Sequence, residues 1–182
     1  ETALFLGKKA TEKTVKSTDL SGSKVIAFAT HGLISGEITG LAEPGLILTP
    51  PELGTNVDDG ILTASEVAQL TLFPGLVILS ACNTASSDGT PGAGGLSGLA
   101  KAFFYAGSRT LLVSHWSVPS EAAKHLTTGM FKALGEDPAM GPAEALKQSM
   151  TALVRDADNP LFSHPLFWAP FTVVGEGAAE PQ

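Results

Sequence analysis

Short runs of apolar residues alternate along this chain with segments that have helical periodicity. The clearest run is Leu76-Val77-Ile78-Leu79, which stands between Pro74-Gly75 and a polar stretch. Four consecutive apolar residues are typical of a strand that is buried on both faces. The same pattern predicts an edge strand at 45–49. It also predicts a strand at 167–174, and because this segment contains Pro170, we expect it at an edge or a bulge. Further strands are predicted at residues 2–7, 25–29 and 109–114.

Start and stop signals predict helices between these strands. Thr63-Ala64-Ser65-Glu66 has the spacing of a capping box, Gly107 suits the residue after a helix end, and Pro119 suits a first helical residue. The predicted helices cover residues 8–19, a segment from 63 onward, 96–106, 119–135 and 142–155. Alternating strands and helices predict one α/β domain with a mostly parallel sheet over 1–175, followed by a disordered tail at 176–182.

Composition narrows the class of function. The 182 residues include 11 basic and 18 acidic side chains, for a net charge of −7, and no stripe of Lys or Arg runs along the chain. This argues against binding to nucleic-acid phosphates. No apolar run approaches the roughly 18 residues of a membrane-spanning helix, and no signal-peptide pattern follows Glu1. The single cysteine cannot form an internal disulfide, which fits a reducing compartment, so we expect a cytoplasmic protein.

A cysteine and a histidine each follow a predicted strand. Cys82, the only cysteine, comes just after the Leu76 run, and His31-Gly32 follows the strand at 25–29. In open α/β sheets, ligands bind at the carboxyl ends of the strands. If the two strands are parallel neighbours, a thiol and an imidazole emerge on one rim. Cysteine with histidine is a common nucleophile and base, so the pattern predicts a nucleophilic site.

Other interpretations of these residues stay open. A lone buried cysteine is often an inert small hydrophobe, and a lone histidine is often structural. A zinc site would need ligand spacing such as Cys-x-x-Cys, which is absent, so no metal or other cofactor is expected. Residues 89–95 are rich in glycine and precede a predicted helix, as in a phosphate cradle, but they lack the P-loop ending. The whole stretch 83–95 predicts a mobile surface loop beside the site.

Several short motifs follow one another in a recognisable order. They are Phe28-Ala29-Thr30-His31-Gly32, Asp59-Gly60-Ile61-Leu62-Thr63-Ala64, Leu79-Ser80-Ala81-Cys82-Asn83-Thr84, Gly95-Leu96-Ser97-Gly98-Leu99-Ala100, Trp116-Ser117-Val118-Pro119 and Phe167-Trp168-Ala169. With these motifs the chain resembles the CHAT family of caspase-like cysteine peptidases from about Leu6 to Gly175. His31 precedes Cys82 by 51 positions, close to the spacing of about 50 residues in caspases.

The resemblance implies a fold and a chemistry. The fold is a caspase-like three-layer α/β sandwich, with a mostly parallel central sheet and helices on both faces. The chemistry is peptide-bond cleavage by a Cys/His dyad without a cofactor, with Cys82 as nucleophile and His31 as base. The backbone amides of Gly32 and Cys82 are then the expected oxyanion donors. Family members are often joined to helical-repeat sensor segments, which implies a protein or peptide substrate and an activating partner.

Departures from the family pattern affect the expected pocket. The family usually has Leu where His115 stands, and related separases have an acidic residue where Ser117 follows Trp116. Caspases have a pocket glutamine at the position of Ser80. We therefore expect Ser80, Trp116 and Ser117 to line the first substrate pocket, without strict cleavage after arginine. Family domains also normally begin with a strand and helix before the region matching Leu4, and 1–175 is expected to lack them.

Two alternatives to a cysteine endopeptidase stay open. The chain could keep the caspase-like fold as a catalytically silent scaffold or interaction module. It could also be a nucleotide-binding α/β domain that uses its glycine-rich loop. The presence of both His31 and Cys82 favours the peptidase over the scaffold, and the missing phosphate-loop residues weigh against the nucleotide-binding domain.

Overall fold

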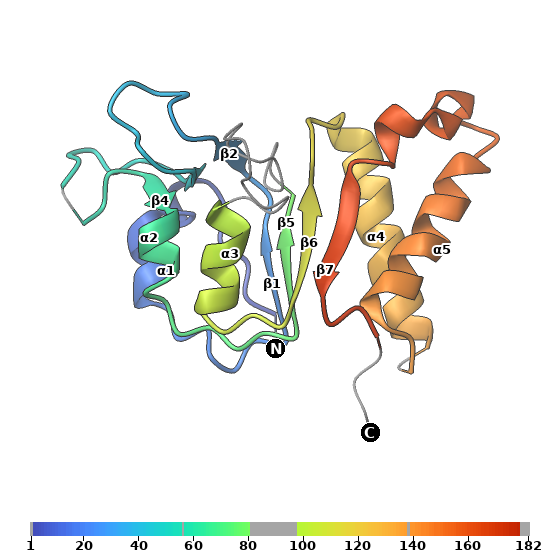
Figure 1. The fold of residues 1–182 in the computed structure, drawn as a ribbon, viewed down its shortest axis with the longest axis horizontal. Coiled ribbons are helices and arrows are strands. Elements are labelled where there is room, and N and C mark those ends of the chain that lie inside the picture. Colours follow the sequence, from blue (N-terminus) through green and yellow to red (C-terminus); the bar gives the residue numbers. More distant parts are fainter. Residues whose placement is uncertain (1, 56, 81–97, 138, 179–182) are drawn as a thin grey trace.

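A four-stranded sheet forms the centre of the molecule (Figure 1). The computed structural model describes residues 2–55, 57–80, 98–137 and 139–178. In the order β1-β5-β6-β7, the strands are Val25–Phe28, Leu76–Leu79, Thr110–Ser114 and Phe171–Gly175. β1, β5 and β6 are parallel, and β7 runs antiparallel to β6. The mostly parallel sheet predicted from the sequence is therefore confirmed.

A second, smaller sheet was not predicted. It is antiparallel, has the order β2-β3-β4, and consists of His31–Leu33, Gly45–Ile47 and Ile61–Thr63. The predicted edge position of 45–49 is wrong, because β3 is hydrogen-bonded on both sides and lies in the middle of this sheet. Of its three strands only β3 was predicted, as part of 45–49, because strands of three residues such as β2 and β4 are too short to show a period of two.

Helices cover both faces of the central sheet (Figure 1). One layer holds the short helices α1, α2 and α3, and the other holds the longer helices α4 and α5. Their bounds are Glu12–Ser17, Ala64–Val67, Gly98–Tyr105, Ser120–Glu136 and Pro142–Val154. Three 3-10 segments complete the regular structure of the described residues, at Gly7–Lys9, Pro160–Ser163 and Pro165–Phe167. The predicted three-layer α/β architecture is confirmed.

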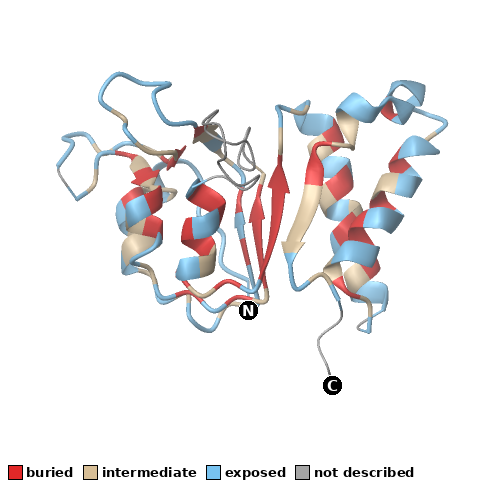
Figure 2. Cartoon of the chain, in the orientation of Figure 1, coloured by how far each residue is buried: buried red, intermediate tan, exposed pale blue. Residues whose placement is uncertain are grey.

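β5 is buried on both faces, as its run of apolar residues predicts (Figure 2). Val77 and Leu79 belong to the core that includes Phe103 of α3. Leu76 and Ile78 belong to the second core, which includes Leu126 of α4. Successive side chains of a strand point to opposite faces, so an uninterrupted apolar run fills two cores at once. This strand is the part of the fold that the sequence marks most clearly.

The predicted helix signals are largely confirmed. The Glu66 carboxylate accepts hydrogen bonds from the backbone N–H and the hydroxyl of Thr63, both at 2.9 Å, at the start of α2. Gly107 follows α3 with a φ of +105°, a left-handed conformation that glycine adopts without strain. Pro119 precedes α4 as its N-cap instead of being its first helical residue.

Predictions near the two ends of the chain need correction. The strand predicted at 2–7 is absent: residues 2–6 have no regular structure, and Leu4 and Leu6 are exposed. The helix predicted at 8–19 shortens to α1 and the 3-10 turn before it. The strand predicted at 167–174 begins only at Phe171, because Phe167 ends a 3-10 segment and residues 168–170 form a turn. β7 does lie at a sheet edge, and residues 179–182 of the predicted tail lie outside the described ranges.

Candidate functional site

The carboxyl ends of β1 and β5 lie side by side. Phe28 pairs with Leu79 in the parallel ladder, and the next backbone N–H, that of Ser80, donates a 3.0 Å hydrogen bond to the Phe28 carbonyl oxygen. The two strands are therefore parallel neighbours, which is the condition on which the predicted site depends. Cys82 comes two residues after Ser80 and lies outside the described residues, as does the predicted loop at 83–95.

His31 stands where the central sheet gives way to the small sheet. It is the first residue of β2 and follows the end of β1 after only Ala29 and Thr30. Its side chain is exposed, and its register partner in β3 is Ile47. Gly32, half-buried, pairs with Leu46 in the same ladder. The base predicted from the sequence thus lies at the rim where β1 ends.

A cavity of about 500 Å³ opens at this rim. It extends from the ends of β1, β5 and β6 to α4, and both His31 and Ser80 line it. Trp116 and Ser117, the other predicted pocket residues, follow β6 and do not line this cavity. Trp116 is 39% exposed, and its indole N–H donates a 3.3 Å hydrogen bond to the Leu166 carbonyl oxygen. The structure therefore brings together two of the four described side chains predicted for the site.

The cavity also contains residues that the sequence analysis missed. Ser114 is the last residue of β6, is 4% exposed and lines the cavity. Its place at the carboxyl end of a parallel strand is the signal that would have identified it. Ala123 and Thr127 of α4 line the opposite wall. No motif marked them, because they enter the site through helix packing.

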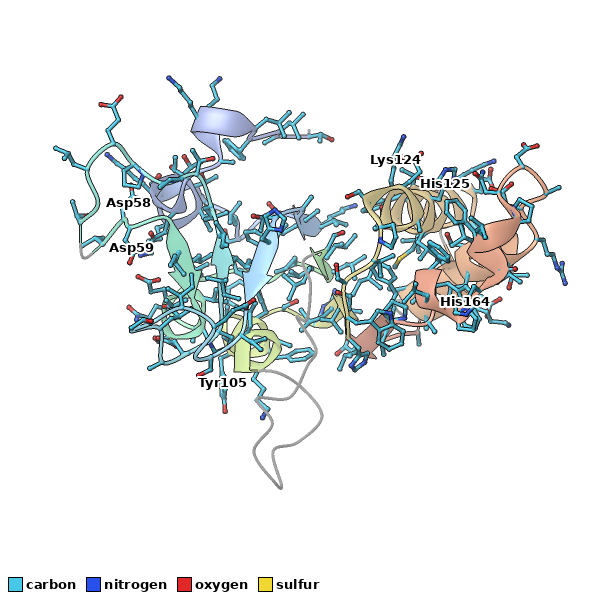
Figure 3. The ribbon with its side chains drawn as sticks, turned by 90° about the horizontal axis from the view of Figure 1, so that it is seen from above. Asp58, Asp59, Tyr105, Lys124, His125 and His164 are labelled. Atoms are coloured by element: carbon cyan, nitrogen blue, oxygen red, sulfur yellow. The ribbon has the colours of Figure 1, made fainter. Side chains whose placement is uncertain are left out.

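Two further histidines have structural surroundings. Seen from above, Figure 3 places His125 and His164 on the side of α4 and α5, across the molecule from Asp58 and Asp59. The His125 ring lies 5.7 Å from the ring of Phe162. Nδ1 of His164 accepts a 3.2 Å hydrogen bond from the Leu166 backbone N–H, at the start of a 3-10 turn. Neither residue lines the cavity that contains His31.

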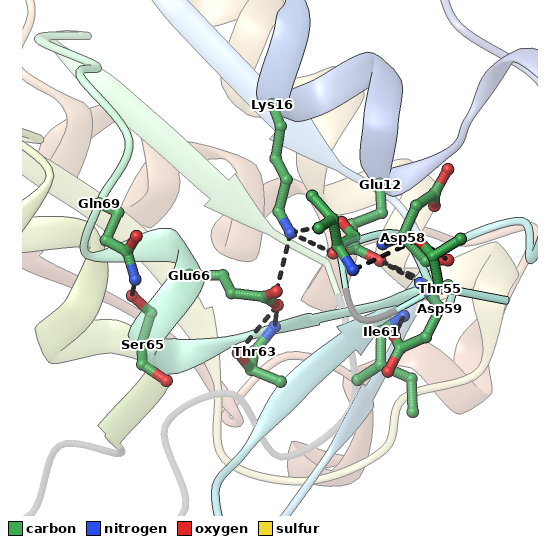
Figure 4. Close-up of polar contacts among 12 residues, drawn as sticks. Glu12, Lys16, Thr55, Asp58, Asp59, Ile61, Thr63, Ser65, Glu66 and Gln69 are labelled. Carbon is green, nitrogen blue, oxygen red and sulfur yellow. Dashed lines mark hydrogen bonds and ion pairs between the residues drawn. The ribbon is translucent and has the colours of Figure 1, made fainter.

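An ionic cluster supports the small sheet from the α1 side (Figure 4). The Lys16 ammonium contacts the carboxylates of both Glu12 and Glu66, the second at 2.7 Å. Burial lowers the pKa of Lys16, but hydrogen bonds to the two carboxylates outweigh burial and hold this pKa above its ordinary value. Burial raises the pKa of Glu66, and hydrogen bonds from Lys16 and Thr63 hold it below its ordinary value. Lys16 and Glu66 are therefore ionised at neutral pH.

Glu12 connects this cluster to the turn before β4. Its side chain is 1% exposed, and one oxygen accepts hydrogen bonds from the backbone N–H groups of Asp59, at 2.9 Å, and Gly60, at 3.1 Å. The Gly60 carbonyl oxygen in turn accepts a 2.8 Å hydrogen bond from the N–H of Leu48, next to β3. A buried carboxylate in α1 thus anchors the small sheet that carries His31.

The described part of the chain shows no metal centre and no membrane span. In residues 2–55, 57–80, 98–137 and 139–178, no three His, Cys, Asp or Glu side chains are grouped to hold a metal ion. Among the helices described, none combines the length and apolar character needed to cross a membrane.

Comparisons with known proteins identify the family. Residues 1–176 match the model of the CHAT domain. The chain is also similar to tetratricopeptide repeat protein 28 of Mus musculus and to the protein of the same name of Homo sapiens. Each is 34% identical over 119 residues, a match that covers 63% of this chain and 4% of the relative. Because the family model spans nearly the whole chain, the chain belongs to the CHAT domain family, a caspase-like family related to peptidases.

Proposed function

We propose that this chain is a cysteine endopeptidase that cleaves protein or peptide substrates with Cys82 as nucleophile and His31 as base. One observation carries the proposal: His31 and Ser80 line one cavity at the adjoining ends of β1 and β5. Cys82 follows Ser80 by two residues, so we place the only thiol of the chain at the edge of this cavity. Membership of the CHAT family supports the same chemistry.

The proposed reaction follows the general scheme of nucleophilic catalysis. The Cys82 sulfur attacks the carbonyl carbon of the scissile peptide bond while His31 accepts the thiol proton. Backbone N–H groups of Gly32 and Cys82 donate hydrogen bonds to the oxyanion that forms. The C–N bond then breaks as His31 returns the proton to the leaving amine. Water, deprotonated by His31, hydrolyses the thioester and restores the free thiol.

The cavity is the proposed binding site for the substrate side chain before the cut bond. Ser80 supplies part of its wall, and we place Trp116 and Ser117 at its outer rim, after β6. No Asp or Glu occurs among the described residues that line it. An arginine side chain would therefore find no carboxylate partner among them, which argues against strict cleavage after arginine.

The relatives suggest the setting in which such an enzyme acts. Both are named for tetratricopeptide repeats, and the chain spans about 4% of their length. We propose that a helical-repeat segment or partner activates the site, and that the enzyme acts in the cytoplasm, where its thiol stays reduced. To test the need for activation, peptide turnover by the 182-residue chain alone is compared with its turnover in the presence of a helical-repeat segment of the kind named in the relatives. Equal rates would reject the need for activation.

Labelling with a peptide-based, thiol-reactive probe tests the chemistry. Because Cys82 is the only cysteine, every labelled molecule reports on this thiol. We expect rapid labelling of the wild type, no labelling of Cys82→Ala, and labelling of His31→Ala that is slower by at least about 100-fold. His125→Ala, which removes an exposed histidine outside the cavity, should label like the wild type.

Two outcomes would count against the proposal. Equal labelling rates for His31→Ala and the wild type would show that the imidazole does not assist the thiol. Rapid labelling without turnover of any peptide in a library would favour the alternative, a catalytically silent caspase-like scaffold.

A further inference from the structure

The chain crosses from one sheet to the other immediately before His31. β1 ends at Phe28 and pairs with β5, whereas β2 begins at His31 and pairs with β3. Only Ala29 and Thr30 lie between the two strands. The backbone conformation of these two residues therefore determines the position of the His31 side chain.

Thr30 forms a hydrogen bond to β3 of the small sheet. Its hydroxyl donates a hydrogen bond to the carbonyl oxygen of Ile47, the last residue of β3. Ile47 is also the residue that stands opposite His31 in the β2–β3 ladder. The Thr30 side chain therefore connects the end of β1 to the register partner of His31.

The His31 ring is exposed. Among the described residues, no side chain forms a hydrogen bond with this ring. Within this part of the chain, the backbone that carries the ring therefore sets its orientation. That backbone is held against β3 in two ways, by the β2–β3 ladder and by the Thr30 hydroxyl bond to Ile47.

We infer that Thr30 is a positioning residue for the proposed peptidase, and that its hydroxyl bond to Ile47 holds the His31 imidazole in place at the end of β1. This inference rests on the proposed function and assigns the residue that orients the base. Thr30 takes no part in bond making or breaking. It acts by reducing the number of orientations open to His31, and a misplaced catalytic group lowers the rate of the chemical step much more than it weakens substrate binding.

Two substitutions at this position separate the hydroxyl from the shape of the side chain. Thr30→Val keeps the branched shape but loses the donor, and Thr30→Ser keeps the donor but loses the methyl group. We expect Thr30→Val to lower kcat by about three- to tenfold with KM changed less than about twofold, the size of effect of one net hydrogen bond. Thr30→Ser should retain most of the wild-type kcat.

Thr49→Val is the matched control. The Thr49 hydroxyl, just after β3, also donates to a backbone carbonyl, that of Gly7 at 2.8 Å, and among the described residues no hydrogen bond joins Thr49 to Ala29 or Thr30. This variant should keep the wild-type kcat. A similar loss of kcat in Thr30→Val and Thr49→Val, or equal losses in Thr30→Val and Thr30→Ser, would overturn the inference.

A spectroscopic measurement distinguishes failure of the inference from failure of the proposed function. Imidazole NMR signals of His31, assigned with His31→Gln, are compared in Cys82→Ala and in Cys82→Ala/Thr30→Val. We expect shifted or broadened His31 signals in the second protein, with those of the other three histidines unchanged. Unchanged His31 signals would overturn the role of Thr30 whether or not the enzyme turns over. A wild type that cleaves no peptide, with shifted His31 signals, would reject only the proposed function.

Discussion

The backbone N–H of Ser80 donates a 3.0 Å hydrogen bond to the carbonyl oxygen of Phe28. This bond extends the β1–β5 ladder by one step beyond the last paired residues. The carboxyl ends of β1 and β5 therefore lie side by side, and His31 and Ser80, which follow them, line one cavity. The shape of this cavity and the packing that supports it determine which substitutions the protein should tolerate.

Enlarging Ser80 should block the proposed substrate pocket. We expect Ser80→Phe to lower kcat/KM by at least about tenfold, because the ring would take up space in the cavity of about 500 Å³. Ser117→Phe should have a much smaller effect, because Ser117 does not line this cavity. Steady-state kinetics on a peptide pool checks both variants. Equal losses would show that Ser117 lies in the pocket, as the sequence predicts.

Removing the buried charge of Glu12 should destabilise the fold. Glu12→Gln keeps the size of the side chain but replaces a carboxylate that serves two backbone N–H groups and Lys16. We expect the free energy of unfolding to fall by about 1–3 kcal/mol, since hydrogen bonds to charged groups contribute more than neutral ones. Urea denaturation measures this value. The exposed Glu144, paired with Lys147, provides the control Glu144→Gln, whose stability should equal that of the wild type.

The ionic cluster should contribute to stability over a defined pH range. Because the pKa of Glu66 lies below its ordinary value of 4.5, its contribution is complete above that value and is lost as the pH falls through the lowered pKa. The wild type should therefore be more stable than Glu66→Gln at pH 7, and the difference should shrink below pH 4.5. Unfolding curves between pH 7 and about pH 3 test this. A difference that stays constant over this range would exclude Glu66 as its source.

At high pH, the contribution of the same cluster to stability should fall as the pH rises. The pKa of Lys16 lies above its ordinary value of 10.5, so its contribution is complete below that value and is lost as the pH rises through the raised pKa. We expect the stability difference between the wild type and Lys16→Met to be constant from pH 7 to about pH 10 and then to fall. A decrease that begins near neutral pH would contradict this assignment.

The contact between α4 and α5 should not tolerate a methyl group at Gly129. A Cβ at this position would lie 2.4 Å from Oγ of Ser149, a buried hydroxyl that donates a 2.8 Å hydrogen bond to the Leu126 carbonyl oxygen. We expect Gly129→Ala to destabilise the protein by about 1–3 kcal/mol in spite of the better helix propensity of alanine. Thermal denaturation provides the measurement.

Gly135 is the matched control in the same helix. A Cβ there would meet no heavy atom within 4 Å, so Gly135→Ala should leave stability unchanged or raise it by up to about 1 kcal/mol. A second substitution, Ser149→Ala, should recover part of the loss in Gly129→Ala. Equal changes in stability for Gly129→Ala and Gly135→Ala would show that α4 and α5 can move apart without loss of stability.

The elements that the sequence predicted best are those with strong local signals. The run at Leu76–Leu79 is buried from both sides, and this double burial is what makes the strand uniformly apolar. The Thr63 and Glu66 pair marks the start of α2 because both partners of the cap lie within one turn. The apolar run at 25–29 was enough to predict that His31 follows a strand, whereas the structure shows that this strand lies beside β5.

The features that could not be predicted from the sequence depend on contacts between segments that are distant in the chain. The small sheet joins three-residue strands, and the turn before β4 is hydrogen-bonded to Glu12, which lies 47 and 48 positions away in the chain. Ser114 and Thr127 reach the cavity through strand order and helix packing, which leave no local pattern. The segment 2–6 has the apolar residues of a strand, but in the described residues it pairs with no strand.

The two strands that lead to the proposed dyad differ in how deeply they are embedded. All four residues of β5 are buried, and the strand is hydrogen-bonded on both sides. β2 has three residues, begins with an exposed one and lies at the edge of the small sheet. Amide hydrogens of β5 should therefore exchange with solvent only when the whole domain opens, and those of β2 far sooner. A signal that activates the proposed enzyme would therefore need the least free energy if it acted on β2, the strand of the proposed base.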